Sequence, residues 1–115
     1  MSGPRLTRRL DRLVPVRTGD GAGGYAEGWE SRGTLWAEVD ARSGGVRVTE
    51  TGAVPRLRVR ITCHALPQGH PGRPAPGDRL RDGARLFAVE AVHEDDPSGR
   101  FLVCFAREWI EGDGA

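Results

Sequence analysis

The stretch RFLVCFARE, residues 100–108, decides the fold. Its apolar side chains point to both faces of an extended strand: Phe101, Val103 and Phe105 to one face, and Leu102, Cys104 and Ala106 to the other. A strand that is apolar on both faces belongs in the middle of a closed barrel or a sandwich. The stretch therefore predicts an all-β fold built around this strand.

The segments around it have the two-residue period of half-buried strands. In RLRVRITCHA, residues 56–65, Leu57, Val59, Ile61 and Cys63 share one face, while arginines, Thr62 and His64 share the other. Strands are also expected over 33–40 and 84–93, and a first strand over about 11–17, where Pro15 restricts it to a sheet edge. The pair Asp82-Gly83 is a hairpin signal, so residues 79–108 are predicted to form a three-stranded meander.

The connections are long and rich in glycine and proline. Segments 18–28 and 66–77 are predicted loops, and 43–55 is predicted to be a long projecting hairpin or loop. Residues 1–10 are expected to form an N-terminal arm, and 109–115 a C-terminal tail. No window has a helical period. The 115 residues thus predict one small all-β domain, a β-barrel or sandwich with long projecting loops.

The composition excludes several classes of protein. The net charge is +1, with 17 basic residues that are all arginine, so no global attraction to nucleic acid or to a membrane is expected. No apolar run approaches the roughly 20 residues of a membrane span, and the N-terminus lacks the apolar stretch of a signal peptide. We therefore expect an intracellular protein without a membrane partner.

No catalytic or metal-binding pattern is present. Cys63 and His64 are adjacent and would point to opposite faces of a strand, and His70 and His93 have no ligand spacing. Cys63 and Cys104 are better explained as buried thiols than as a disulfide. The acidic residues 94–96 precede Pro-Ser-Gly and fit a solvated turn. We expect no cofactor and no metal. A small enzyme or metal-dependent protein is an alternative that only the scattered histidines and acidic residues favour.

Three arginines share one face of the segment 56–65. Arg56, Arg58 and Arg60, with Arg42 and Arg47 nearby in sequence, are able to follow a phosphate backbone, which leaves a small β-barrel nucleic-acid-binding module as an alternative. The strand lacks the interleaved aromatic residues on which bases stack. Pairing of these arginines with carboxylates of a neighbouring subunit is the preferred interpretation.

Trp36 stands on the polar face of its strand, because Leu35, Ala37 and Val39 occupy the apolar one. A bulky aromatic residue in that position is typical of an interface anchor. The alternative is that it caps one open end of the barrel. Trp29 and Trp109 carry the same ambiguity.

The order of these features resembles the phage head–tail joining proteins, also called head-closure or stopper proteins, including those of bacterial gene transfer agents. The matching pieces run along the whole chain: the strand region 6–17, the Gly-rich loop ending in Trp29, then 35–39 with 42–44, 58–62, 76–80, 83–89 and 99–102. The chain departs from the family pattern at Cys63 and His64, where an arginine and an aromatic residue are usual, and in its loop 66–77.

The resemblance implies a non-enzymatic structural protein of a virus-like particle. Members of that family are small β-barrels that assemble in the host cytoplasm as a ring below the portal and its adaptor, in the neck of the particle. The ring closes the channel that holds packaged DNA, without sequence specificity, and docks the tail through its terminator or tube protein. With the arguments above, this predicts a protein interface formed by Trp36, Arg42, Val46, Arg47, Val48, Arg56, Arg58, Arg60 and Trp109.

Overall fold

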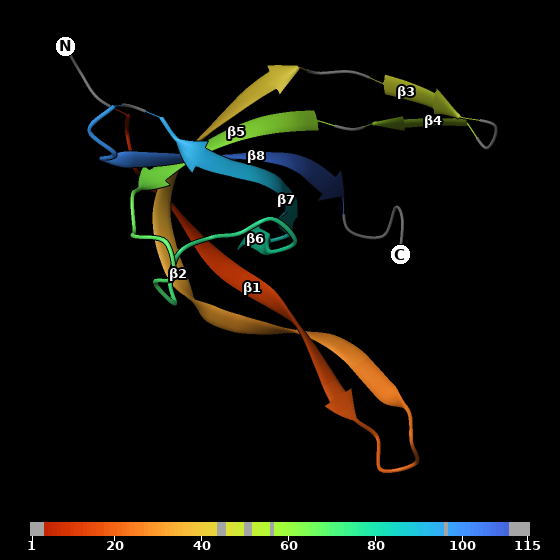
Figure 1. The fold of residues 1–115 in the computed structure, drawn as a ribbon. Helices are drawn as coiled ribbons and strands as arrows, with labels where there is room; N and C mark the ends of the chain where they lie inside the picture. The colour runs from red at the N-terminus through yellow and green to blue at the C-terminus, as the bar shows by residue number, and fades with distance from the viewer. Residues whose placement is uncertain (1–3, 44–45, 50–51, 56, 96, 111–115) are drawn as a thin grey trace.

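Six strands form one antiparallel sheet that closes on itself (Figure 1). The computed structural model describes residues 4–43, 46–49, 52–55, 57–95 and 97–110, with side chains outside 41–57 and 109–110. The order around the sheet is β1-β2-β5-β8-β7-β6, and β1 pairs with β6 through Asp11 to Leu13. The strands are β1 (Arg8–Gly19), β2 (Tyr25–Ser43), β5 (Leu57–His64), β6 (Arg79–Asp82), β7 (Arg85–Glu94) and β8 (Phe101–Ile110). The prediction of a small all-β, barrel-like domain is confirmed.

The core lies inside the closed sheet. Its largest fully buried side chains come from five different strands, so the core depends on closure of the sheet: Leu10, Val59, Ile61, Leu80, Phe87, Leu102 and Cys104. The prediction that β8 is apolar on both faces holds for Leu102, Val103 and Cys104, all fully buried. It is wrong for Phe105, which is 38% exposed, because the outer face of β8 is only partly covered.

The C-terminal strands form the predicted meander, with β6, β7 and β8 as consecutive neighbours. The hairpin between β6 and β7 is centred one residue later than expected, because Asp82 pairs with Arg85 and leaves Gly83 and Ala84 as the turn. Gly83 has a φ of 61° and Ala84 a negative φ, the pattern of a turn that needs glycine in its first position.

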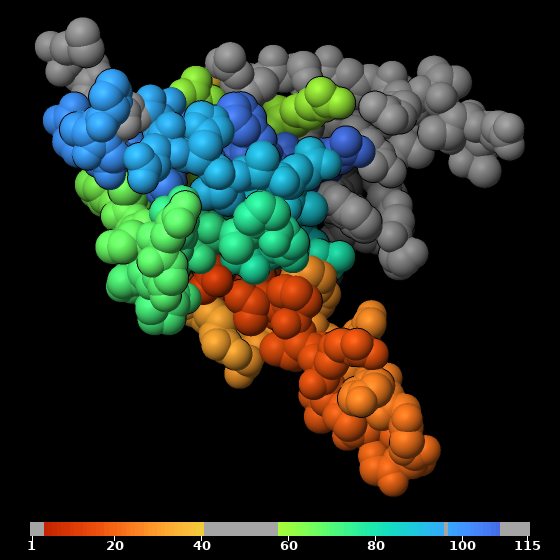
Figure 2. Space-filling model, viewed as in Figure 1, coloured from red at the N-terminus to blue at the C-terminus, as the bar shows by residue number. Residues whose placement is uncertain are grey.

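The N-terminal strands extend well beyond the closed sheet. Past Leu13, β1 pairs only with β2, and the two continue as a twisted ribbon that projects from the body (Figures 1 and 2). We call residues 14–31 the arm, a different segment from the N-terminal arm expected over residues 1–10. The loop predicted over 18–28 is wrong in extent, since only residues 20–24 lie between the strands, and β1 begins at Arg8 rather than near residue 11. Pro15 lies where β1 has a single neighbour, as its missing N–H predicts.

The segment predicted as a projecting hairpin or loop contains a second ribbon. Strands β3 (Val46–Thr49) and β4 (Gly52–Pro55) pair with each other and with no strand of the closed sheet. They lie between β2 and β5, which pair up to Ser43 and Arg58. We call this ribbon the β3–β4 hairpin. Its backbone hydrogen bonds are separate from those of the body.

The predicted loop 66–77 has no strand and lies against one end of the closed sheet (Figure 1). Pro74 is fully buried there, and Arg12 of β1 is also buried. The loop is fastened to β7 by two backbone hydrogen bonds, from Val89 N to Asp78 O at 2.9 Å and from Gly77 N to Val89 O at 3.0 Å. It therefore forms part of the folded body.

Candidate functional site

The predicted interface residues with described side chains lie on the outer face of the sheet. On β2, Ala37 is fully buried and Trp36 is exposed, so the alternation places Trp36 outside. On β5, Val59, Ile61 and Cys63 are buried, and Arg58 and Arg60 point the other way. β2 and β5 are neighbours in the sheet, and so Trp36 and the two arginines belong to one continuous surface.

Trp36 is 54% exposed and pairs in register with Arg9 of β1. An exposed fraction this large does not fit a residue that seals the core from water. The end of the sheet is instead closed by the loop that buries Pro74. The exposure argues against the cap, and the role of Trp36 as an interface anchor stays a prediction.

The arginine face is partly neutralised within the chain. Arg60 forms an ion pair with Asp95, with 2.6 Å between Nη2 and Oδ1, while Arg58 is exposed and has no partner among the described residues. Other arginines of the described part also form ion pairs, among them Arg8, Arg12, Arg32, Arg85 and Arg107. An arginine that already has a carboxylate partner contributes little to a phosphate-binding track, and this argues against the nucleic-acid alternative.

Two stacked pairs on the outer face were not anticipated from the sequence. His64 of β5 stacks on Phe101 with ring centroids 5.6 Å apart, and His93 of β7 stacks on Phe105 at 5.1 Å. Both phenylalanines belong to β8. The alternation of side chains along β8 could have indicated these pairs. It places Phe101 and Phe105 on the face opposite the core, next to the outward positions of β5 and β7.

The arm carries two exposed aromatic side chains, each under an arginine. The Arg17 guanidinium lies 4.5 Å from the ring centroid of Tyr25, and the Arg79 guanidinium 4.0 Å from that of Trp29. Trp29 is 41% exposed, and Arg79 comes from β6, so this contact fixes the base of the arm to the body. The sequence reasoning missed this arrangement because it treated the segment as a loop.

The other predicted interface residues lie outside the described side chains. The backbone places Arg42 in β2, Val46, Arg47 and Val48 in β3, and Trp109 opposite Leu86 at the end of β8. Arg56 lies outside the described residues. The assignment of all nine residues, Trp36, Arg58 and Arg60 included, to an interface stays a prediction.

The two cysteines are buried free thiols, as predicted. They contact each other in the core, and this contact, together with burial, raises the pKa of the Cys104 thiol. Among the described residues, no three His, Cys, Asp or Glu side chains gather as metal ligands would, and no helix is long and apolar enough to cross a bilayer.

The chain is similar to known proteins in both sequence and fold. The family model described as "Phage head completion protein" matches residues 1–108. A chain in a solved structure of the virion of a native gene transfer agent particle is 43% identical, with a TM-score of 0.82, over 94% of this chain and 99% of that one.

A second solved structure shares the fold. It is the solution structure of protein SF1141 from Shigella flexneri 2a, with 23% identity and a TM-score of 0.70, over 96% of this chain and 99% of that one. No curated protein gave a significant match.

Proposed function

The chain belongs to the phage head completion protein family, a non-enzymatic structural family, and we propose that it is a head–tail connector of a tailed phage or gene transfer agent. The observation that carries the proposal is the 43% identity, over nearly the whole of both chains, to a component of a gene transfer agent virion. On this proposal the protein resides in the neck of the particle and forms a ring below the portal or its adaptor. The ring closes the DNA channel and presents a surface to the tail terminator or tube protein.

The chemistry of the outer face supports a role in contacts with protein. Trp36 supplies a large apolar surface, and Arg58 supplies a guanidinium that has no partner among the described residues. Exposed tryptophan and arginine are the residue types that dominate binding energy at protein interfaces. In the proposed ring, these side chains meet carboxylates and apolar groups of a neighbouring subunit or of the adaptor.

The β3–β4 hairpin suits a docking element for a topological reason. It pairs with no strand of the body, so its ordering against a partner leaves the closed sheet unchanged. A ribbon also has backbone groups on its outer edges with which a partner strand is able to pair. We propose that Arg42, Val46, Arg47, Val48 and Arg56 contact neighbouring proteins in the assembled particle.

Removal of the hairpin tests the proposal. Deletion of 46–55 leaves residues 44, 45, 56 and 57 as a four-residue connection between Ser43 and Arg58, which already pair. We expect the purified variant to keep the parent's Tm and circular dichroism spectrum. In particles, we expect DNA-filled or leaking heads without tails, counted by electron microscopy.

A point variant provides the matched comparison. Trp36→Ala should lower the yield of tailed particles, whereas Arg32→Ala should not, because Arg32 is exposed where β2 leaves the arm and forms its ion pair with Glu30 of the same strand. Normal tailed particles from both the deletion and Trp36→Ala would overturn the docking role of this surface.

A further inference from the structure

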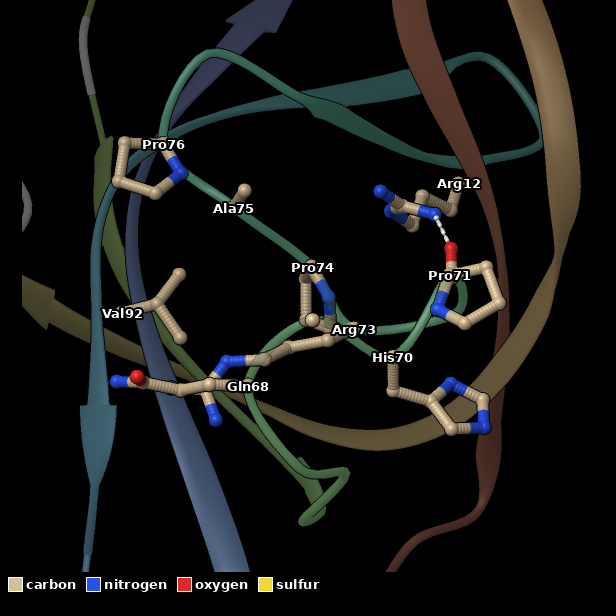
Figure 3. A pocket seen from close by; sticks show the side chains of 10 residues that line it. Arg12, Gln68, His70, Pro71, Arg73, Pro74, Ala75, Pro76 and Val92 are labelled. Atoms are coloured by element: carbon tan, nitrogen blue, oxygen red, sulfur yellow. Dashed lines mark hydrogen bonds between the residues drawn. The ribbon is translucent and has the colours of Figure 1, made fainter.

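A pocket lies beneath the loop that joins β5 to β6 (Figure 3). Its volume is about 470 Å³, and its walls include Arg12, Gln68, His70, Arg73 and Val92 together with prolines of the loop. In Figure 3 the Arg73 side chain extends toward the side of the pocket where Gln68 and Val92 lie. None of the residues that line the pocket is acidic.

The walls of this pocket are held by the loop's own hydrogen bonds. Arg73 N donates to His70 O at 3.0 Å, and Gly72 N donates to His70 Nδ1 at 2.9 Å. Arg12 Nη1 donates to Pro71 O at 2.7 Å from the side of β1. Because proline restricts the backbone further, the pocket is formed before any ligand enters.

The two arginines of the pocket differ in whether a carboxylate neutralises their charge. The charge of Arg12 is offset by Asp78, with 2.8 Å between Nε and Oδ2. Arg73, which is half-buried, donates from Nη1 to the neutral carbonyl of Leu66 at 2.9 Å, and no carboxylate among the described residues forms an ion pair with it. The charge of a half-buried guanidinium that has no carboxylate partner is not neutralised, so the pocket carries a net positive charge.

His70 lines the pocket on the side away from the end of the Arg73 side chain (Figure 3). Its Nδ1 accepts the Gly72 N–H, and the neutral ring therefore carries its hydrogen on Nε2. The pocket thus offers hydrogen-bond donors beside prolines and the Val92 side chain. This combination of donors and short apolar walls suits a small anionic group on an aliphatic stem.

We propose that this pocket receives an aspartate or glutamate side chain from a loop of a neighbouring protein in the particle. The guanidinium fork of Arg73 matches a carboxylate geometrically, and the prolines and Val92 pack against the methylene stem of the incoming side chain. A nucleic-acid backbone fits less well, because it is bound by several cations in a row and only Arg73 here lacks a carboxylate. The identity of the neighbour rests on the proposed function, but the carboxylate specificity of the pocket does not.

The test is a titration of the isolated protein followed by NMR. The probes are N-acetylglutamate methylamide, its glutamine counterpart and inorganic phosphate. We expect saturable shifts of the backbone amides of 68–76 and of Arg73 Nε with the glutamate probe, and no saturable shift with the glutamine probe. Comparable shifts with both amino-acid probes would overturn the proposal, and tighter binding of phosphate would assign the pocket to phosphate groups instead.

Three variants make the result specific to Arg73. Arg73→Gln should abolish the saturable shifts, and Arg73→Lys should weaken binding because it keeps the charge but loses the fork. Arg58→Gln, which removes an exposed arginine of β5, should bind like the parent. Retained binding in Arg73→Gln would overturn the assignment. If that variant fails to fold, the comparison of the two amino-acid probes on the parent decides. Normal tail attachment after deletion of 46–55 would refute the docking hairpin and leave this binding result unaffected.

Discussion

Arg12 Nε lies 2.8 Å from Oδ2 of Asp78, in the buried region where β1 meets the loop that closes one end of the sheet. The same carboxylate oxygen accepts the Ala75 N–H at 2.9 Å, and the backbone of Asp78 bonds to Val89 of β7. The Asp78 side chain thus connects the loop to β1, and the Asp78 backbone connects it to β7. These contacts anchor the loop that forms the wall of the pocket.

Asp78→Ala should destabilise the domain by about 3–5 kcal/mol, because it leaves the Arg12 guanidinium buried without its anion. Equilibrium unfolding in denaturant measures the loss. Asp82→Ala is the matched control, since Asp82 and Arg8 form an ion pair of similar length, 2.7 Å, that is much more exposed than the Arg12 pair. The control should cost less than about 1 kcal/mol. Equal losses in the two variants would show that burial of the Arg12 pair is not what stabilises the loop.

Ile61→Ala and Phe105→Ala should differ in cost, although both residues lie on central strands. Ile61 is fully buried, and truncation of such a side chain costs about 2–5 kcal/mol. Phe105 is 38% exposed and stacks on His93, so its truncation exposes little new core and should cost clearly less. Thermal melts of the two variants measure the difference. A Phe105 variant that melts below the Ile61 variant would place Phe105 in the core.

Both thiols should resist labelling in the folded protein. Cys63 and Cys104 are buried, and the contact with Cys63 together with burial raises the pKa of Cys104, which keeps that thiol protonated. An aromatic disulfide reagent at pH 8 should react slowly with the native protein and rapidly with both thiols in guanidinium. Fast native labelling would mean that the β5–β8 pairing opens readily.

The tip of the arm should loosen in acid. Asp20 Oδ1 accepts the N–H groups of Ala22 and Gly24 at 2.8 and 3.0 Å, and these bonds lower the pKa of the Asp20 carboxyl. A carboxyl whose pKa is lower in the folded state contributes stability above its ordinary value of about 3.9, and the contribution disappears as the pH falls through the lowered value.

The two amide resonances should therefore shift together below about pH 4, with a midpoint under the ordinary aspartate value. Asp20→Asn should keep the bonds, since its amide oxygen also accepts, and should remove the pH dependence. A midpoint at or above the ordinary value would contradict the assigned bonds.

The strands of the body were predictable because one face of each is buried. In β5, three apolar residues, Val59, Ile61 and Cys63, alternate with polar ones, and the alternation itself reports the inside and the outside. The family resemblance was also readable from the order of short motifs, and the family match confirms it.

Most of the arm was not predictable by the same reasoning, although the strand expected over 11–17 reaches into it. Beyond Leu13 its strands have one neighbour each and cover no core, so no alternation marks them, and four glycines lie at or near the tip. The pocket at Arg73 was missed for a related reason. Its side chains come from β1, β7 and a loop without periodicity, and only the closed sheet brings them together.

Closure of the sheet also determines where this protein is able to join another by strand pairing. β1 and β6 would be the edge strands of an open sheet, but they pair with each other through Asp11 to Leu13, so the sheet has no free edge where it closes. Unpaired edges run instead along the arm and the β3–β4 hairpin, which leave the body in different directions (Figure 1). Strand addition along these two ribbons would leave the pairing of the closed sheet unchanged, so a partner that adds a strand there meets a body that is already complete.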